Sequence, residues 1–237
     1  ILNPFDGFAL EMALQMKDKT GGTVTVMSMG PAQAEDVLRE SLSVGADEAY
    51  LVSGREFGGS DTLATSYILS CAVKAVEEKR GEKFDVIYCG KQAIDGDTGQ
   101  VGPEMAEHLG YTQITYATEL VACEGDKVQV RKETADGYDV LEAALPVVIS
   151  VTKTPFELRY PTVKKRLAAN RAQIPTITPQ DMEGQIDLSR AGLKGSPTKV
   201  KKSFTPQHNK NCVVVEEDTL SASAVKLVAL LSDDKKI

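Results

Sequence analysis

Short apolar runs alternate with longer amphipathic stretches over the first half of the chain. The short runs are rich in β-branched residues and lie at Thr23–Met29, Glu48–Ser53 and Phe84–Cys89. Between them, apolar residues recur at helical spacing, as they do from Pro31 to Leu42. Strands separated by helices of this length form right-handed βαβ units. The pattern therefore predicts an α/β fold with a doubly wound, mostly parallel sheet, in which Phe84–Cys89 is a central strand.

Residues that start and stop helices support this segmentation. Asn3 and Pro4 are typical of an N-cap and of a first helical position. Gly21-Gly22 ends the helix that they begin. Asp61 is expected to cap a further long helix.

Beyond Gln113 the apolar period changes to two, which is typical of β-hairpins. Gly125-Asp126 and Asp136-Gly137 are hairpin turn signals. Ala144–Val151 is almost entirely apolar and reads as a last strand. We expect the α/β domain, residues 1–155, to end shortly after it.

Charge divides the chain near the same point. Residues 159–210 hold eleven basic and three acidic residues, a net charge of +8, whereas the rest of the chain carries −15. Residues 174–207 are rich in Pro, Gly, Ser and Thr and have weak periodicity. We therefore predict a boundary near residue 155, followed by a separate basic segment at 156–175. A long C-terminal arm without a core is expected at 176–237, ending in an apolar helix at Ser221–Leu231.

Composition excludes several classes of protein. The 237 residues are 42% hydrophobic, enough for a packed core, but no run approaches the ~20 apolar residues of a membrane helix. A net charge of −7, 5% aromatic residues and no Trp argue against nucleic-acid binding. Four widely spaced cysteines argue against a metal site or a disulfide scaffold and favour a reducing, cytoplasmic setting.

Three segments fall where an open parallel sheet binds its ligands, at the carboxyl ends of strands. They are Asn3–Asp6, Met27–Pro31 and the glycine-rich stretch Gly90–Ala106. Glycines let a backbone approach a phosphate, and amides at a helix start attract one. Thr98 and Gln100 can donate further hydrogen bonds, while Asp95 and Asp97 can accept them from ribose. On spacing alone, a solvated surface loop remains an equal alternative.

Five strings, in order along the chain, resemble the beta subunit of electron transfer flavoprotein. They are NPFD at 3–6, VTVMSMGPAQAEDVLRESLSVGADEAYLVS at 24–53, DTLATSY at 61–67, CGKQAIDGDTGQVGPEMAEHLG at 89–110 and LRYPTVK at 158–164. The resemblance covers roughly residues 1–175 and implies a Rossmann-like sheet of the adenine-nucleotide alpha-hydrolase type. Family members begin with a strand and a nucleotide-contacting loop. We therefore expect a first strand before Ile1, where the chain opens without Met.

The resemblance also implies a nucleotide site in the beta subunit. Housekeeping members hold AMP there, whereas electron-bifurcating members hold an FAD. AMP-type members have a string like DDDxxQTGQ, and the present DGDTGQVGP is similar to the bifurcating type, in which Gly96 opens space. FAD is therefore expected, with AMP as the alternative. The implied contacts are Asn3, Pro4, Phe5, Asp6, Met29, Asp95, Gly96, Asp97, Thr98, Gly99, Gln100, Val101, Gly102, Pro103, Glu104, Met105 and Ala106.

As a bifurcating member, the chain would work in an NADH-linked complex rather than as an enzyme alone. NADH would give a hydride to the beta-subunit flavin. One electron would pass to the FAD of the alpha subunit and on to a flavin dehydrogenase, and the other to ferredoxin or flavodoxin. The flavin does the chemistry, so no catalytic side chain is expected. A non-redox ATP binder of the stress-protein kind is the alternative from another class.

The basic run after Leu158 overlies the loop with which the family docks its dehydrogenase. Val163 stands where the family has an apolar anchor residue, and an apolar tip ringed by basic groups suits an acidic partner. The run departs from acyl-CoA-dehydrogenase-linked members, so a 2-hydroxy-acid dehydrogenase such as a lactate-oxidising one is an equal candidate. A solvated basic face is the plain alternative. The expected docking residues are Arg159, Tyr160, Val163, Lys164, Lys165 and Arg166.

Overall fold

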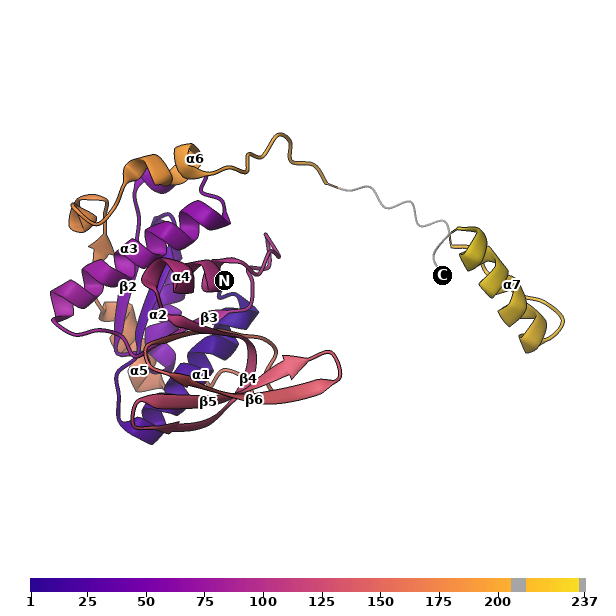
Figure 1. Ribbon diagram of the computed structural model, residues 1–237, viewed down its shortest axis with the longest axis horizontal. Helices are drawn as coiled ribbons and strands as arrows, with labels where there is room; N and C mark the ends of the chain where they lie inside the picture. The colour runs from indigo at the N-terminus through magenta and orange to yellow at the C-terminus, as the bar shows by residue number, and fades with distance from the viewer. Residues whose placement is uncertain (206–211, 235–237) are drawn as a thin grey trace. The chain divides into compact units, whose positions relative to one another are not determined.

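A computed structural model describes residues 1–205 and 212–234 (Figure 1). Two compact units make up the chain, one spanning Ile1–Lys199 and the other beginning at Val200. Each unit is described by itself. Within the described residues, none of the helices is both long enough and apolar enough to pass through a bilayer.

The first half of the larger unit alternates helices and strands, as the apolar pattern predicts. Its elements are α1 (Pro4–Thr20), β1 (Thr25–Met29), η1 (Ala32–Ala34), α2 (Glu35–Val44), β2 (Glu48–Val52), η2 (Arg55–Phe57), α3 (Thr62–Arg80), β3 (Val86–Gly90) and α4 (Val101–Leu109).

Hairpins and then short elements follow. They are β4 (Thr112–Glu124), β5 (Lys127–Thr134), β6 (Gly137–Ala144), β7 (Val147–Val151), α5 (Val163–Arg171), β8 (Thr176–Ile177), η3 (Gln180–Met182), η4 (Leu188–Arg190) and α6 (Gly192–Gly195). Ala144 closes β6 instead of opening the last strand, because the Leu145-Pro146 step separates β6 from β7.

The α/β fold class is confirmed, with the strands divided between two hydrogen-bonded sheets. One is parallel in the order β1-β2-β8, and the other is mixed in the order β3-β7-β4-β5-β6. In the mixed sheet β7 pairs in parallel with both β3 and β4, while β4, β5 and β6 form antiparallel hairpins.

The prediction that Phe84–Cys89 is a central strand is wrong for the sheet as described. β3 lies at the edge of the mixed sheet, and its five residues are only half-buried. β7 takes the interior position, and all five of its residues are buried because it has strand neighbours on both sides. Two equally apolar runs are thus distinguished by long-range pairing, which local sequence does not encode.

Helix ends follow the predicted signals. Asp61 caps α3 by accepting a hydrogen bond from the Ala64 amide at 3.1 Å. Burial raises the pKa of Asp61, but hydrogen bonds from the Thr198 and Ala64 amides outweigh it and hold that pKa below its usual value. Gly21 ends α1 with φ at +75°, a left-handed conformation that glycine adopts without strain.

Two buried clusters of side chains, one on each face of α1, hold this helix in place. On one side, Ala9 and Met12 join the buried cluster of the mixed sheet, which includes Val147 and Ile149. On the other side, Leu10 and Leu14 pack in a second cluster with Val24 and Val44. Because both faces of α1 are buried, the helix is held firmly between the two sheets.

Residues 176–199 differ from the extended arm that composition predicts. β8 pairs with β2, and Ile177 and Met182 are fully buried in the cluster that covers α3. The Ser196 hydroxyl accepts from the Asp61 amide at 2.9 Å, which ties this stretch to the start of α3. A few apolar residues spaced along a polar segment are enough to anchor it, although no periodic pattern marks them.

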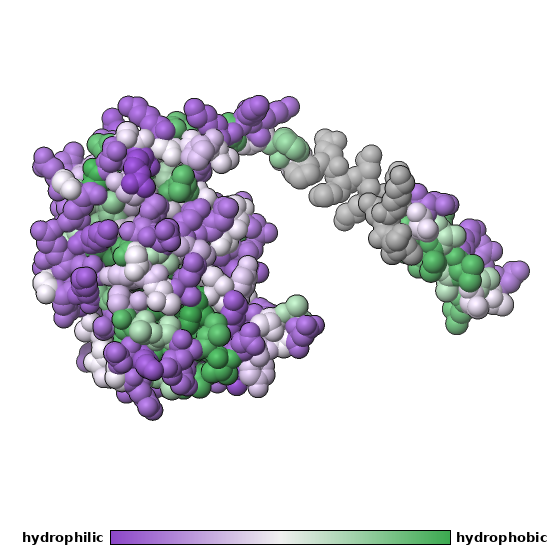
Figure 2. All heavy atoms as spheres, in the orientation of Figure 1, coloured by the Kyte–Doolittle hydropathy of each residue, from purple (hydrophilic) through white to green (hydrophobic). Residues whose placement is uncertain are grey.

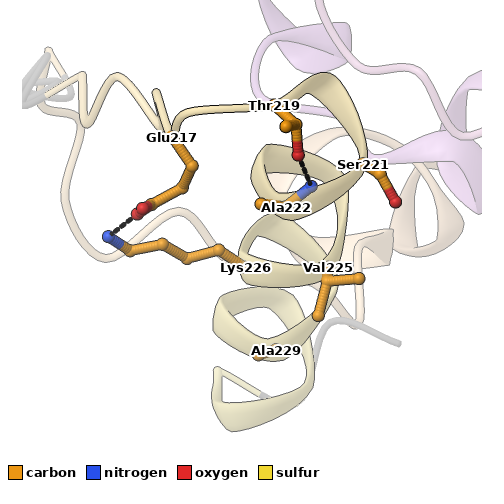
Figure 3. A pocket seen from close by; sticks show the side chains of 7 residues that line it. All are labelled: Glu217, Thr219, Ser221, Ala222, Val225, Lys226 and Ala229. Carbon is orange, nitrogen blue, oxygen red and sulfur yellow. Dashed lines mark hydrogen bonds and ion pairs between the residues drawn. The ribbon is translucent and has the colours of Figure 1, made fainter.

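The second unit contains α7 (Leu220–Asp233), which confirms the predicted terminal helix. Thr219 caps it by accepting from the Ala222 amide at 3.2 Å, and Lys226 pairs with Glu217 (Figure 3). None of its described residues is buried. Apolar atoms gather along one side of the helix (Figure 2), and the exposed residues include Leu220, Val225, Leu227, Val228 and Leu230.

Truncating Ile177 tests whether β8 belongs to the core. Ile177→Ala removes a fully buried side chain, so we expect a loss of about 2–5 kcal/mol in the free energy of unfolding, as for other large-to-small core changes. Leu193→Ala is the control, because that side chain is 62% exposed. Urea unfolding measures both. An equal, small effect would show that residues 176–199 add nothing to the core.

Candidate functional site

The start of α1 is docked on the end of β3. The Gly90 amide donates to Asp6 Oδ1 at 2.6 Å. The Asn3 side-chain amide donates to Asp6 Oδ2 at 2.7 Å and to the Gln92 carbonyl at 2.9 Å. Two of the three predicted segments, Asn3–Asp6 and the stretch after β3, are thereby brought together.

This contact requires glycine at position 90. A Cβ there would lie 2.7 Å from the backbone nitrogen of Asp6 and 2.8 Å from the carbonyl carbon of Phe5. Both atoms belong to the backbone of α1, so no side-chain rotation could relieve the clash. Gly90 therefore sets how closely the helix start approaches the strand end.

The start of α4 packs on the same strand end from another direction. A Cβ on Gly102 would lie 2.7 Å from Cys89 Sγ. Burial raises the pKa of the Cys89 thiol to about 12, with a further contribution from the neighbouring Asp6 carboxylate. Cys89 is thus a protonated packing group beneath α4.

The loop between β3 and α4 turns on residues in the left-handed region. Asp97 has φ at +56° and Gly99 at +66°. The Asp97 amide donates to the Ala93 carbonyl at 3.0 Å, and its carboxylate accepts from the Gln92 side chain. A Cβ on Gly96 would meet no described atom within 4 Å. The loop is therefore folded on itself, with open space at Gly96.

Lys91 directly follows β3 and lies close to two aromatic rings. Its ammonium lies 5.9 Å from the centre of the Phe5 ring and 5.1 Å from that of Tyr116, within cation–π range. Tyr116 has φ at +59°, rare for an aromatic residue, and is 40% exposed. Lys91 lies in the predicted stretch Gly90–Ala106 but not among the implied contacts, and Tyr116 lies outside that stretch. The position of Lys91 directly after a strand end is a signal that could have identified it, whereas no local signal marks Tyr116.

The other predicted contacts are placed less directly. Gln100 joins α4 to α3, since Thr62 Oγ1 donates to its side-chain oxygen at 3.1 Å. Met29 ends β1 and packs with the cluster that covers α3. Met105 and Ala106 are buried, which leaves only backbone atoms for a ligand. Asp95 and Thr98 are exposed.

Unsatisfied polar groups border the site. Asn3 Oδ1 is buried and has no hydrogen-bond partner among the described residues. Within the same residues, the N-caps of α1, α2, α4 and α6 make no side-chain hydrogen bond, whereas those of α3, α5 and α7 do. Of the helices without a cap, α1 and α4 begin at the end of β3, and helix starts, with their positive dipole ends, suit the phosphates of a nucleotide. These groups fit an adenine nucleotide, with phosphates at the helix starts.

A second feature is the docking segment, which we define as residues 159–171. Thr162 caps α5 by accepting from the Lys165 amide at 3.2 Å. At the other end of α5, Arg39 donates to the carbonyls of Ala169 at 2.9 Å and Ala172 at 2.8 Å. α5 is thereby fixed on α2.

Between these ties the docking segment presents apolar side chains to solvent. Tyr160 is 90% exposed, Val163 78% and Leu167 53%. Val163 and Leu167 share one face of α5, four residues apart. Lys164 and Arg166 are exposed beside them. This surface has the apolar tip and basic surround that the sequence predicts.

Two of the predicted docking residues have contacts inside the chain. Arg159 forms ion pairs with Glu11 at 2.8 Å and Asp18 at 2.9 Å. Lys165 Nζ lies beside Gly45, 3.2 Å from where a Cβ would stand. Arg159 therefore anchors the docking segment, and Lys165 lies against the end of α2.

The four cysteines and the acidic residues do not assemble a metal site in the part of the chain that the structure describes. The cysteines are free thiols there. At the end of β3, the starts of α1 and α4 bring backbone amides and a few polar side chains together.

Comparison with known proteins identifies the family. Residues 1–182 match the family described as Electron transfer flavoprotein domain. The chain is 48% identical over 241 residues to electron transfer flavoprotein subunit beta of Megasphaera elsdenii, covering 100% of this chain and 88% of the relative. It is 42% identical over 231 residues to Protein FixA of Azorhizobium caulinodans, covering 97% and 82%.

A third relative is the acryloyl-CoA reductase electron transfer subunit gamma of Anaerotignum propionicum, 43% identical over 210 residues, covering 87% of this chain and 77% of the relative. The chain belongs to the electron transfer flavoprotein family, as a beta subunit. The resemblance seen in the sequence motifs is confirmed at the level of family and subunit.

The contact between Gly102 and Cys89 gives a test of the site geometry. Gly102→Ala places a methyl group 2.7 Å from Cys89 Sγ, so we expect a loss of about 1–3 kcal/mol in unfolding free energy, typical of overpacking. Cys89→Ala in the same chain should restore part of it. Denaturant unfolding of the single and double variants measures their coupling.

Gly96→Ala is the matched control, because a Cβ at that position meets no described atom. It should leave the unfolding free energy within about 0.5 kcal/mol of the parent, as for surface substitutions in general. Additive effects of Gly102→Ala and Cys89→Ala would contradict the packing of α4 on Cys89.

Proposed function

We propose that this beta subunit holds an FAD at the start of α1 and α4 and works in an NADH-linked, electron-bifurcating flavoprotein. In this role it takes a hydride from NADH and divides the electrons between ferredoxin or flavodoxin and, through the alpha-subunit FAD, a flavin dehydrogenase. A bound flavin supplies the redox chemistry, and the protein supplies binding, orientation and a tuned environment. The alternative is a housekeeping subunit that holds AMP.

One observation carries the nucleotide proposal: two uncapped helix starts meet at the end of β3 beside Asn3 Oδ1, which is buried and has no hydrogen-bond partner among the described residues. Amides that lack side-chain caps are available to phosphate oxygens. Asn3 Oδ1 can accept one hydrogen bond, and buried acceptors are normally satisfied. The family motif assigns nucleotide contacts to residues 3–6 and 95–106, and these ranges include both helix starts.

The loop supports FAD over AMP. Gly96 borders open space among the described residues, and the Asp97 turn is closed by Gln92. An isoalloxazine extends the ligand well beyond a single phosphate, so it needs space next to the diphosphate. The string DGDTGQVGP, which resembles the bifurcating type, supplies glycine at that point.

We also propose that the exposed face of the docking segment binds the dehydrogenase. Tyr160, Val163 and Leu167 provide the apolar anchor, while Lys164 and Arg166 attract an acidic partner surface. The relative from Anaerotignum propionicum is named an electron transfer subunit of acryloyl-CoA reductase, which supports an acyl-CoA class of partner. A 2-hydroxy-acid dehydrogenase stays a candidate because of the basic sequence after Val163.

The alpha subunit is the proposed partner of α7. The exposed residues of α7 include five large apolar side chains. An exposed apolar surface of this size is typical of a site that binds another protein. A partner that covers this side of α7 would bury them. This accounts for an apolar, capped helix that follows a polar stretch.

Counting nucleotides in the intact heterodimer tests the proposal. We expect two FAD molecules and no AMP per heterodimer, measured by visible absorbance and by chromatography of a denatured extract. One FAD with one AMP would replace the bifurcating assignment by the housekeeping one. Asp95→Ala should lower the count to about one FAD, because it removes an acceptor from the loop.

Asp126→Ala is the control for Asp95→Ala, since Asp126 lies in the turn between β4 and β5 and not in the loop between β3 and α4. It should leave both nucleotides bound. If Asp95→Ala still binds the full number of nucleotides, Asp95 does not contribute to the site.

Replacing the apolar anchor tests the docking surface. Val163→Asp puts a charge on a side chain that is 78% exposed, so the fold and the flavin content should persist. Docking of the dehydrogenase should weaken by about tenfold or more, as expected when an interface anchor is lost. Val200→Asp, at an 85% exposed position outside the docking segment, should leave docking unchanged. Normal coupled turnover in Val163→Asp would show that the dehydrogenase docks on another surface.

A further inference from the structure

We infer that Glu11 is the positioning residue of the docking segment, which it holds on α1 through its ion pair with Arg159. The inference rests on the docking surface proposed above. It assigns a role to a buried carboxylate that the nucleotide site does not use. Nothing in the local sequence around Glu11 marks it, because its partner lies 148 residues further along the chain.

Glu11 grips both the side chain and the backbone of Arg159. Its Oε1 accepts from Nη2 of Arg159 at 2.8 Å, and its Oε2 accepts from Nε at 2.9 Å. Oε2 also accepts from the Arg159 backbone amide at 3.0 Å. A paired guanidinium and carboxylate fix orientation as well as distance. The added backbone bond fixes where the chain enters the docking segment.

The pair is built to stay charged. Glu11 is 6% exposed, and burial alone would raise its pKa. Hydrogen bonds and charge from Arg159 outweigh that effect and lower the pKa of Glu11, while the same contacts raise that of Arg159. A buried carboxylate is costly without a partner. Moving Arg159 away from Glu11 would therefore cost free energy, so the start of the docking segment is held in place.

The location of Glu11 on α1 explains what is gained by fixing the start of the docking segment. The first turn of α1 is docked on Gly90, and Glu11 lies five residues after Asp6, about 7–8 Å further along the helix. The far end of the docking segment is held separately by Arg39. Tyr160 and Val163 thus lie on a segment tied at both ends. Ordering a binding surface in advance lowers the entropy lost on association.

The test uses the intact heterodimer with Glu11→Gln and Glu11→Ala. We expect the KM for the dehydrogenase to rise about tenfold while kcat is unchanged, since a disordered segment weakens docking without altering the docked complex. Limited trypsin digestion should cleave faster at Lys164–Arg166. The number of bound nucleotides should stay at the parent value. Arg159→Lys, which keeps the charge and loses the paired geometry, should lie between parent and Glu11→Ala.

Lys19→Gln is the matched control. Lys19 lies on the same helix, is exposed and donates to the Leu120 carbonyl at 3.4 Å, and no hydrogen bond joins it to the docking segment among the described residues. It should change neither KM nor cleavage. An unchanged KM in Glu11→Ala would overturn the inference, and so would a loss of nucleotide or a fall in kcat, which would show that Glu11 only supports α1.

Val163→Asp, measured in parallel, separates this inference from the docking proposal. If Val163→Asp raises KM and Glu11→Ala does not, the docking surface stands and the role of Glu11 is refuted. If neither variant changes KM, the docking surface is refuted and the docking role of Glu11 with it. Cleavage rates then report only on the order of the segment.

Discussion

The contact between Asp6 and Gly90 is the constraint on which the rest of the larger unit depends. A carboxylate in the first turn of α1 accepts the amide that ends β3, and a Cβ at position 90 would push the two backbones apart. This one contact sets the position of the α1 start at the candidate nucleotide site. Two buried clusters hold the rest of α1, which carries Glu11 and, through Arg159, the entry of the docking segment. The strand-end contact and these two clusters together set the geometry of two surfaces.

The two helix starts at the candidate site lack side-chain caps. The N-caps of α3, α5 and α7 accept hydrogen bonds from their own helices, but those of α1 and α4, like those of α2 and α6, do not among the described residues. A missing side-chain cap costs about 0.5–2 kcal/mol per helix. Asn3 stands at the N-cap position of α1, but its side-chain amide donates to Asp6 and Gln92, and its Oδ1 has no partner among the described residues. A nucleotide bound at the proposed site would offset the missing caps of α1 and α4.

Local sequence signals predicted most of the fold and part of the site. The Asp61 cap, the Gly21 stop, the two hairpin turns and the terminal helix depend on neighbouring residues only, and the structure confirms them. What the sequence did not predict depends on pairing over long separations. The edge position of β3, the burial of Ile177 and Met182, and the use of Arg159 inside the chain are of this kind. Charge counting treats Arg159 and Lys164 alike, although only the first has a buried partner.

The internal use of Arg159 changes how the docking surface is understood. A segment with many basic residues is expected to bind mainly by charge, but exposed ion pairs contribute little to affinity and mostly to the rate of encounter. Lys164 and Arg166 remain exposed for that purpose, while Arg159 has become part of the scaffold. Lasting contact must then come from the apolar groups, of which Tyr160 and Val163 are the most exposed in this segment. Since those groups lie on backbone that is tied to α1 and to α2, their spacing is fixed before a partner arrives. In the proposed docking, the apolar groups held in place by the buried ion pair would set how long a partner stays bound, and the exposed charges would set how fast it approaches.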